Sequence, residues 1–204
     1  MIRASQLPPA ATIPGARTGA RPLIFVRHGA TPPNLAGLRC GGDLDVAMTG
    51  LGRRMARDAA RRIVDAGLHV GLIVSSGLLR TDESARLIAE VLGGVRMVTV
   101  PGLIERRLGE WNLRPLAENE SQLLGDAGPP GGESNADFIA RIGHAVRALL
   151  PQRQLGLLVV GSSGVARALG ALTGRTDTSR VGNGQVLQFD LSALVLPQTE
   201  RDLA

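Results

Sequence analysis

Several residue types are missing or scarce in the 204-residue chain. It has no tyrosine and no lysine, its aromatic content is 2%, and its single cysteine is Cys40. One cysteine cannot form an intrachain disulfide or supply a cysteine-based zinc cluster. No apolar run reaches the roughly 18 residues that a membrane-spanning helix needs. We therefore expect a soluble, cytoplasmic protein with no membrane partner and a core of Leu, Val, Ile and Ala.

The absence of lysine makes all 23 basic residues arginine, and against 18 acidic residues they give a formal net charge of +5. The arginines are interspersed with acids, as around Arg61 and Arg80, and form no basic tract with interleaved aromatic residues. Such tracts are the mark of nucleic-acid binding. The charge pattern therefore argues against a nucleic-acid partner and favours a modest attraction for small anions.

Strand-like apolar runs alternate with helical patterns from residue 23 onward. The expected strands occupy residues 23–26, 69–76, 96–100, 155–160 and, at an edge, 185–190. Helical patterns follow Thr49, cover 79–92, begin again at Ser134 and cover 164–172. This order predicts an α/β three-layer sandwich, with a mostly parallel central sheet and helices on both faces. The helix after Thr49 is expected to bury Met55, Ala59, Ile63 and Val64.

Two segments fall outside this alternation. Residues 1–21 are rich in Pro, Ala and Arg, and their prolines interrupt any amphipathic helix. We expect a flexible N-terminal arm there, in preference to a transit peptide, followed by one domain over 22–204. Residues 112–132 contain the stretch GPPGG and are expected to form a long loop or lid.

Polar residues follow four of the expected strands. Arg27 and His28 come after the first, Arg80 shortly after the second, Glu105 after the third, and 161–167 (GSSGVAR) after the fourth. Parallel sheets bind ligands beyond the carboxyl ends of their strands, so these groups should meet at one rim. Arginines, a histidine and a carboxylate together suit an anionic ligand, above all a phosphoryl group.

These residue types also suggest a reaction. A neutral imidazole can attack phosphorus and carry the group covalently. Arginines can neutralise the phosphoryl oxygens in the transition state, and a carboxylic acid can protonate the leaving oxygen. No metal and no cofactor is needed if guanidinium groups supply the positive charge.

The stretch VRHGATPPN resembles the RHG signature of the histidine phosphatase superfamily, also called the phosphoglycerate mutase-like family. Further stretches resemble family segments in the same order: GLRCGGDLDVAMTGLGRRMA, SSGLLRTDESA, LIERRLGEWN, GGES and the asparagine of VGNGQV. The resemblance runs from about residue 23 to 190. It implies the phosphoglycerate mutase-like fold, His28 as phosphoryl acceptor, Arg27 and Arg80 as phosphoryl-binding arginines, and Glu105 as proton donor.

One position departs from the family pattern. The family's second pocket histidine lies in a stretch V-S-H-G-G-V-x-R, and the flanking Val160, Gly164 and Arg167 place Ser162 at its position. A serine hydroxyl can donate one hydrogen bond but is never cationic. Loss of such a donor commonly costs ~10²–10³ in rate. The departure implies weakened catalysis, a compensating arginine such as Arg39 or Arg106, or a domain that only binds phosphate.

The remaining candidates are expected to contact the substrate. They are Thr31, Asn34, Arg39, Cys40, Gly41 and Ser163. Alternatives stay open for several of them. Glu110 rivals Glu105 as the acid, Ser162 and Ser163 could be helix N-caps, and Cys40 could be a packed side chain.

The functional hypothesis is a metal-independent phosphatase that hydrolyses a small phosphomonoester through a phosphohistidine at His28. One alternative is a catalytically silent domain that binds phosphate or a phosphorylated ligand. The other is a phosphoglycerate mutase-type phosphotransferase. The expected partner is a phosphorylated small molecule, and a homodimer is compatible with the sequence.

Overall fold

A five-stranded sheet forms the middle layer of the computed structural model, which describes residues 21–118, 128–175 and 180–195. Its strands are β1 (Leu23–Arg27), β2 (Leu72–Ser75), β3 (Met97–Thr99), β4 (Leu157–Gly161) and β5 (Val186–Phe189). Their order in the sheet is β3-β2-β4-β1-β5. The first four strands are parallel, and β5 runs antiparallel along β1 at one edge. The expected strands are therefore present, and the last is an edge strand as predicted.

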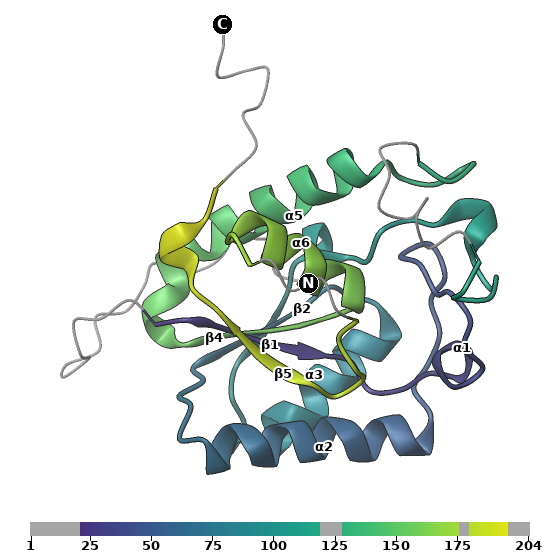
Figure 1. The fold of residues 1–204 in the computed structure, drawn as a ribbon. Coiled ribbons are helices and arrows are strands. Elements are labelled where there is room, and N and C mark those ends of the chain that lie inside the picture. Colours follow the sequence, from purple (N-terminus) through teal and green to yellow (C-terminus); the bar gives the residue numbers. More distant parts are fainter. Residues whose placement is uncertain (1–20, 119–127, 176–179, 196–204) are drawn as a thin grey trace, which may run out of the picture.

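Helices cover both faces of this sheet (Figure 1). Helices α2 (Gly50–Asp65) and α3 (Leu79–Val91) lie on one face, and α5 (Asn135–Leu149) and α6 (Ser163–Leu172) lie on the other. The connections contain the short helices α1 (Pro32–Leu35), η2 (Pro101–Leu103), η3 (Gly109–Trp111), η4 (Leu150–Leu155) and η5 (Leu191–Ala193). The predicted α/β class with helices on both faces is confirmed. In the described part of the chain, no helix has the length and apolar character needed to cross a membrane.

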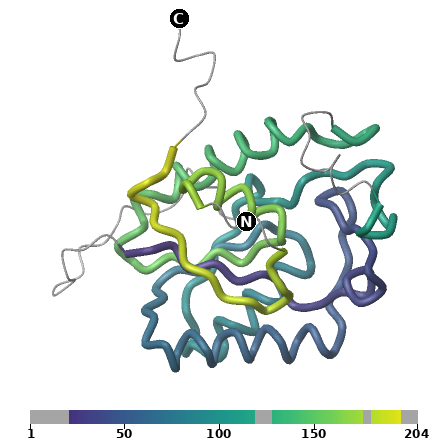
Figure 2. Tube along the Cα trace, viewed as in Figure 1, coloured from purple at the N-terminus to yellow at the C-terminus, as the bar shows by residue number. Residues whose placement is uncertain are grey.

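The sheet separates two apolar cores. Alternate residues of β1 supply them, because successive side chains of a strand point to opposite faces. Leu23 and Phe25 pack with α5 and α6, whereas Ile24 and Val26 pack with α2 and α3. Each such side chain contributes roughly 1.5–3 kcal/mol when fully buried. Burial on both faces explains the continuous apolar run before Arg27. The trace of the chain shows β1 in the middle of the molecule, between the helices of the two faces (Figure 2).

The buried face of α2 differs from the expectation. The helix buries Gly52, Ala56, Ala59, Ala60 and Ile63, whereas Val64 is 56% exposed. Small residues are used here because the helix approaches the backbone after β1 very closely. A Cβ atom on Gly29 would lie 2.0 Å from the Gly52 carbonyl oxygen. The two glycines therefore hold the segment after His28 directly against α2.

Two predicted segments are only partly described. The N-terminal arm, residues 1–21, lies outside the described residues except for Arg21, and residues 119–127 of the predicted lid also lie outside them. The two expected helix starts are formed. The Thr49 hydroxyl accepts from the Gly52 N–H at 3.0 Å, and the Ser134 hydroxyl accepts from the Asp137 N–H at 3.0 Å.

Candidate active site

A pocket of about 110 Å³ opens at the carboxyl end of the sheet. Its lining residues are Arg27, His28, Asn34, Leu38, Arg39, Cys40, Glu105, Arg106, Leu108, Leu116, Ser162, Ser163, Gly164, Arg167 and Arg180. Segments that follow β1, β3 and β4 thus meet here, as the parallel topology requires. Glu110, the rival acid, is exposed and is not among the lining residues.

His28 is held in a defined orientation at the end of β1. Its side chain is 3% exposed, and its Nδ1 lies 2.8 Å from the Gly29 carbonyl oxygen. A carbonyl can only accept, so Nδ1 carries the hydrogen and the neutral ring has its lone pair on Nε2. Burial, and then the charges of Arg80 and Arg27, hold the pKa of His28 well below its usual value. The residue is therefore a neutral imidazole with a free nucleophilic nitrogen at physiological pH.

Arg27 and Arg80 approach the imidazole from different elements. Arg27 ends β1, and its Nη1 donates to the Val181 carbonyl at 2.6 Å. Arg80, from the first turn of α3, is fully buried and donates to the carbonyls of Leu44 (2.8 Å) and Gly41 (3.0 Å). Arg80 is not among the residues that line the pocket, and its Nε is buried without a hydrogen-bond partner. Its charge nevertheless lowers the pKa of His28 more than that of any other residue does.

Glu105 bridges the segment after η2 and the start of α6. Its Oε1 accepts from the Arg106 N–H at 2.7 Å, and its Oε2 accepts from the Gly164 N–H at 2.8 Å. The carboxylate thus caps the positive end of the α6 dipole. The approach is so close that a Cβ atom on residue 164 would lie 2.1 Å from Oε1. Glycine at position 164 is therefore required for Glu105 to lie where it does.

Ser162 and Ser163 place two hydroxyl groups in the pocket wall. Ser162 is the N-cap residue of α6, but its side chain makes no capping hydrogen bond. Ser162 is 4% exposed and Ser163 is 8% exposed, yet neither hydroxyl has a hydrogen-bond partner. Buried hydroxyls are normally paired, so two unpaired ones beside His28 are suited to a ligand. Ser162 does occupy the N-cap position, but its hydroxyl makes no capping hydrogen bond, so the N-cap alternative does not explain the serine side chain.

The other substrate-contact candidates divide into two groups. Asn34, Arg39 and Cys40 line the pocket, whereas Thr31 and Gly41 do not. Thr31 is fully buried, and its N–H donates to the Asn34 Oδ1 at 3.2 Å. Gly41 contributes only its backbone, which accepts from Arg80. Burial raises the pKa of the Cys40 thiol, so this side chain is a packed thiol and not an activated nucleophile.

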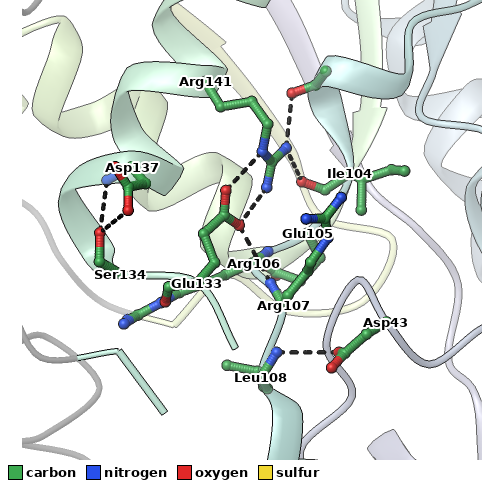
Figure 3. Close-up of polar contacts among 11 residues, drawn as sticks. Asp43, Ile104, Glu105, Arg106, Arg107, Leu108, Glu133, Ser134, Asp137 and Arg141 are labelled. Atoms are coloured by element: carbon green, nitrogen blue, oxygen red, sulfur yellow. Dashed lines mark hydrogen bonds and ion pairs between the residues drawn. The ribbon is translucent and has the colours of Figure 1, made fainter. Parts of the chain in front are cut away.

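A network around Glu133 braces the segment that carries Glu105 (Figure 3). Arg141 of α5 binds the Glu133 carboxylate with two hydrogen bonds of 2.8 and 2.6 Å. The Arg141 Nη1 also donates to the carbonyls of Gly102 and Ile104, each at 2.9 Å. Arg106 lines the pocket and donates its Nε to the Glu133 carbonyl at 2.7 Å. The brace therefore holds the residues on both sides of Glu105.

Asp43 secures the same segment from the opposite side. Its carboxylate accepts from the backbone N–H groups of Leu108 (3.1 Å) and Gly109 (2.7 Å) and from the Asn112 side chain (2.8 Å). Burial works against its charge, but these hydrogen bonds prevail and lower the pKa of Asp43. The bond to Leu108 is drawn in Figure 3.

Two pocket arginines were missed by the sequence reasoning as site residues. Arg167, half-buried in α6, lies four residues after Ser163 and hence on the same helix face, a spacing that could have indicated it. Arg180 lies in the connection between α6 and β5, which has no helical or strand pattern to place it. In the described part of the chain the pocket is lined by five arginines and one carboxylate, Glu105.

This excess of positive charge affects the pKa of Arg27. Burial, then Arg180, and more weakly Arg167 and Arg80, lower its pKa to about 10, although Glu105 acts in the opposite direction. Like charges held together in a pocket are a suitable site for an anion, which would relieve their repulsion. The pocket therefore has a nucleophile, a candidate acid and an excess of anion-binding groups.

A comparison with known families agrees with this geometry. The sequence model of the histidine phosphatase superfamily (branch 1) matches residues 23–203. The chain belongs to this superfamily. A 2,3-bisphosphoglycerate-dependent phosphoglycerate mutase from Methylobacterium sp. (strain 4-46) is 32% identical over 166 residues, which cover 73% of this chain and 78% of the mutase.

Solved structures of similar proteins share the fold of this histidine phosphatase superfamily member. A mycobacterial glucosyl-3-phosphoglycerate phosphatase in complex with VO3 matches with a TM-score of 0.68 and 29% identity, covering 83% of this chain and 90% of that one. A protein from Thermus thermophilus, TTHB049, matches with a TM-score of 0.67 and 27% identity, covering 83% and 93%. The relatives thus include a phosphoglycerate mutase and a phosphatase.

Proposed function

We propose that this protein is a metal-independent phosphatase that hydrolyses a small phosphomonoester through a phosphohistidine at His28. The observation that carries the proposal is the state of His28, a buried neutral imidazole whose Nδ1 is fixed by the Gly29 carbonyl. This arrangement leaves Nε2 as a nucleophile among guanidinium groups that would bind the phosphoryl oxygens.

In the first step, Nε2 of His28 attacks phosphorus and the bond between phosphorus and the leaving oxygen breaks. Arg27 and Arg80, with the hydroxyl groups of Ser162 and Ser163, stabilise the charge on the phosphoryl oxygens. Glu105, in its protonated form, gives its proton to the leaving oxygen. To reach the leaving oxygen, one carboxylate oxygen of Glu105 would give up its hydrogen bond from a backbone N–H.

In the second step, a water molecule attacks the phosphohistidine. The Glu105 carboxylate takes a proton from this water, the nitrogen–phosphorus bond breaks, and the electron pair returns to Nε2. Phosphate then leaves, and Glu105 is again protonated for the next cycle. In this scheme the positive charge comes from arginine side chains, and no metal ion or cofactor takes part.

Hydrolysis is favoured over transfer because a structural relative at 29% identity is a phosphatase. The phosphoglycerate mutase name of curated relatives favours the phosphotransferase as a second candidate. Serine in place of the family's histidine at position 162 favours a catalytically silent phosphate-binding domain as a third candidate.

One set of assays separates these candidates. The wild-type protein and His28→Ala are incubated with p-nitrophenyl phosphate in EDTA, and acid-labile phosphate on the protein is trapped during turnover. We expect turnover and trapped phosphohistidine for the wild type and neither for His28→Ala. Interconversion of phosphoglycerates faster than phosphate release would establish the phosphotransferase instead. Phosphate binding without turnover would establish the silent domain.

A further inference from the structure

Ser162 stands where the family pattern has its second pocket histidine. Its hydroxyl can replace the hydrogen bond of that histidine but not its positive charge. It is buried, lines the pocket and has no hydrogen-bond partner, so it can donate to a phosphoryl oxygen. It cannot carry the positive charge of an imidazolium. A cation close to the phosphoryl site must supply that charge if the reaction is to proceed.

The residues that follow Arg180 are bonded to the end of β1. The Val181 carbonyl accepts from Arg27 Nη1 at 2.6 Å, and the Asn183 side chain donates to the His28 carbonyl at 2.9 Å. Gly184 N–H donates to the Arg27 carbonyl at 2.9 Å. Arg180 therefore extends from a segment fastened to the end of β1, and although it is exposed, it lines the same pocket as His28 and Ser162.

The charge of Arg180 acts directly on the phosphoryl-binding arginine. After burial, it lowers the pKa of Arg27 more than any other group, ahead of Glu105 and Arg167. Both residues line the same pocket, so an anion bound there by Arg27 would also experience the charge of Arg180.

Two further pocket arginines, Arg39 and Arg106, also have contacts of their own with the pocket wall. Arg39 donates to the carbonyls of Leu116 and Glu118, and its guanidinium lies 5.9 Å from the centre of the Trp111 ring. Arg106 donates its Nε to the Glu133 carbonyl. Both guanidinium groups are oriented by the loops that they support.

We propose that Ser162 and Arg180 together replace the second pocket histidine, the hydroxyl as hydrogen-bond donor and the guanidinium as the positive charge on the transferring phosphoryl group. This inference rests on the proposed function. A guanidinium stays charged at any physiological pH, whereas an imidazolium loses its proton near a pH of about 6.5. The pair would therefore keep the site charged at alkaline pH, where a histidine would be neutral.

The first test compares Arg180→Ala with the control Arg107→Ala, an exposed arginine outside the pocket lining. We expect Arg180→Ala to lower kcat by ~10²–10³ and to weaken inhibition by orthovanadate, a transition-state analogue, by a similar factor. Binding of inorganic phosphate should weaken by less than about tenfold, because the ground state needs the charge less. Added guanidinium should restore part of kcat in Arg180→Ala, and Arg107→Ala should match the wild type.

The second test returns a histidine to the pocket. In Ser162→His/Arg180→Ala, we expect kcat to recover at about pH 6 and to fall again above about pH 7, as the new imidazolium loses its proton. A fall caused by loss of the Glu105 proton should be shared with the wild type, whereas the additional fall caused by the new imidazolium should be absent from it. A kcat that is unchanged in Arg180→Ala, or equal losses of vanadate and phosphate binding without rescue, would overturn the inference. Wild-type turnover that depends on His28 would then leave the proposed function intact, whereas absence of that turnover overturns both.

Discussion

The protonation state of His28 is set by its surroundings, and this has a consequence for stability. Its folded pKa lies well below 6.5 because of burial, Arg80 and Arg27. As the pH falls below about 6.5, the unfolded chain binds a proton at this residue and the folded chain does not. The stability associated with neutral His28 is therefore complete above this pH and is lost as the pH falls from there toward the folded pKa.

This linkage predicts a difference between the wild type and His28→Asn. Asparagine can replace the Nδ1 donor to the Gly29 carbonyl but does not titrate. Between about pH 7.5 and 5.5, the free energy of unfolding of the wild type should fall by about 1.4 kcal/mol more than that of His28→Asn. Urea unfolding at both pH values measures this. Parallel losses in the two proteins would show that His28 can be protonated in the folded state.

A second prediction at this scale concerns the glycine beneath Glu105. Gly164→Ala would place a Cβ 2.1 Å from Glu105 Oε1, so the carboxylate must move. We expect a loss of about 1–3 kcal/mol in stability and a fall in kcat close to that of Glu105→Gln. The control is Gly170→Ala in the same helix, where the nearest neighbours of a new Cβ would be 3.8 Å away. That variant should keep full activity and gain up to about 1 kcal/mol.

Thermal unfolding and kcat measurements on Gly164→Ala and Gly170→Ala test this prediction. If Gly164→Ala is as active as Gly170→Ala, the position that Gly164 gives to Glu105 is not needed for proton transfer.

Which single residues the sequence could predict depends on what fixes their position. Ser162 could be placed because valines, a glycine and an arginine on both sides fix its register, and the structure locates it in the pocket beside His28. Arg180 could not be placed, because its position follows from long-range bonds of the next residues to Arg27 and His28. Such bonds leave no periodic pattern in the sequence.

At the scale of elements, the contact of α5 with the segment that bears Glu105 predicts a stability effect. The ion pair between Glu133 and Arg141 is largely shielded, with side chains 12% and 25% exposed, and Arg141 also holds two backbone carbonyls. We expect Glu133→Ala to lower the free energy of unfolding by about 2 kcal/mol, since charge-assisted bonds in such sites are strong. It should also lower kcat, because residues 102–107 lose their support.

The matched control is the pair of Arg86 and Glu90 on α3, whose side chains are 57% and 52% exposed. Exposed pairs of this spacing contribute little, so Glu90→Ala should stay within about 0.5 kcal/mol of the wild type and keep its kcat. Urea unfolding and steady-state kinetics compare the two variants. Equal effects would mean that the Glu133 network is as dispensable as an exposed ion pair.

Helices and strands could be predicted where the hydrophobic pattern of a segment matches the way the segment is buried in the fold. Continuous apolar runs marked β1 and β4, which are buried on both faces. The predicted buried face of α2 was wrong in part: close backbone packing requires glycine at positions 29 and 52, and Val64 is exposed. The full burial of Arg80 was also beyond the sequence, because it depends on the carbonyls of Gly41 and Leu44.

On the scale of the whole molecule, the net charge of +5 is distributed unevenly. Five arginines and one carboxylate line a single pocket of the described chain, and the resulting repulsion lowers the pKa of Arg27 to about 10. This repulsion opposes folding of the empty protein. A bound anion removes it, so anion binding and global stability should be linked.

The linkage predicts a specific thermal shift. At a concentration of inorganic phosphate about 100 times its Kd, mass action adds about 2.7 kcal/mol of stability. For a domain of this size, that corresponds to a rise in Tm of roughly 5–10 °C. Sodium chloride at equal ionic strength should give a much smaller rise, because screening relieves buried charges poorly. Arg27→Gln should lose most of the phosphate response while its Tm in chloride stays close to that of the wild type, since the loss of one hydrogen bond is offset by weaker repulsion. Equal shifts with phosphate and chloride would show that the arginines are merely screened and bind no phosphate at this site.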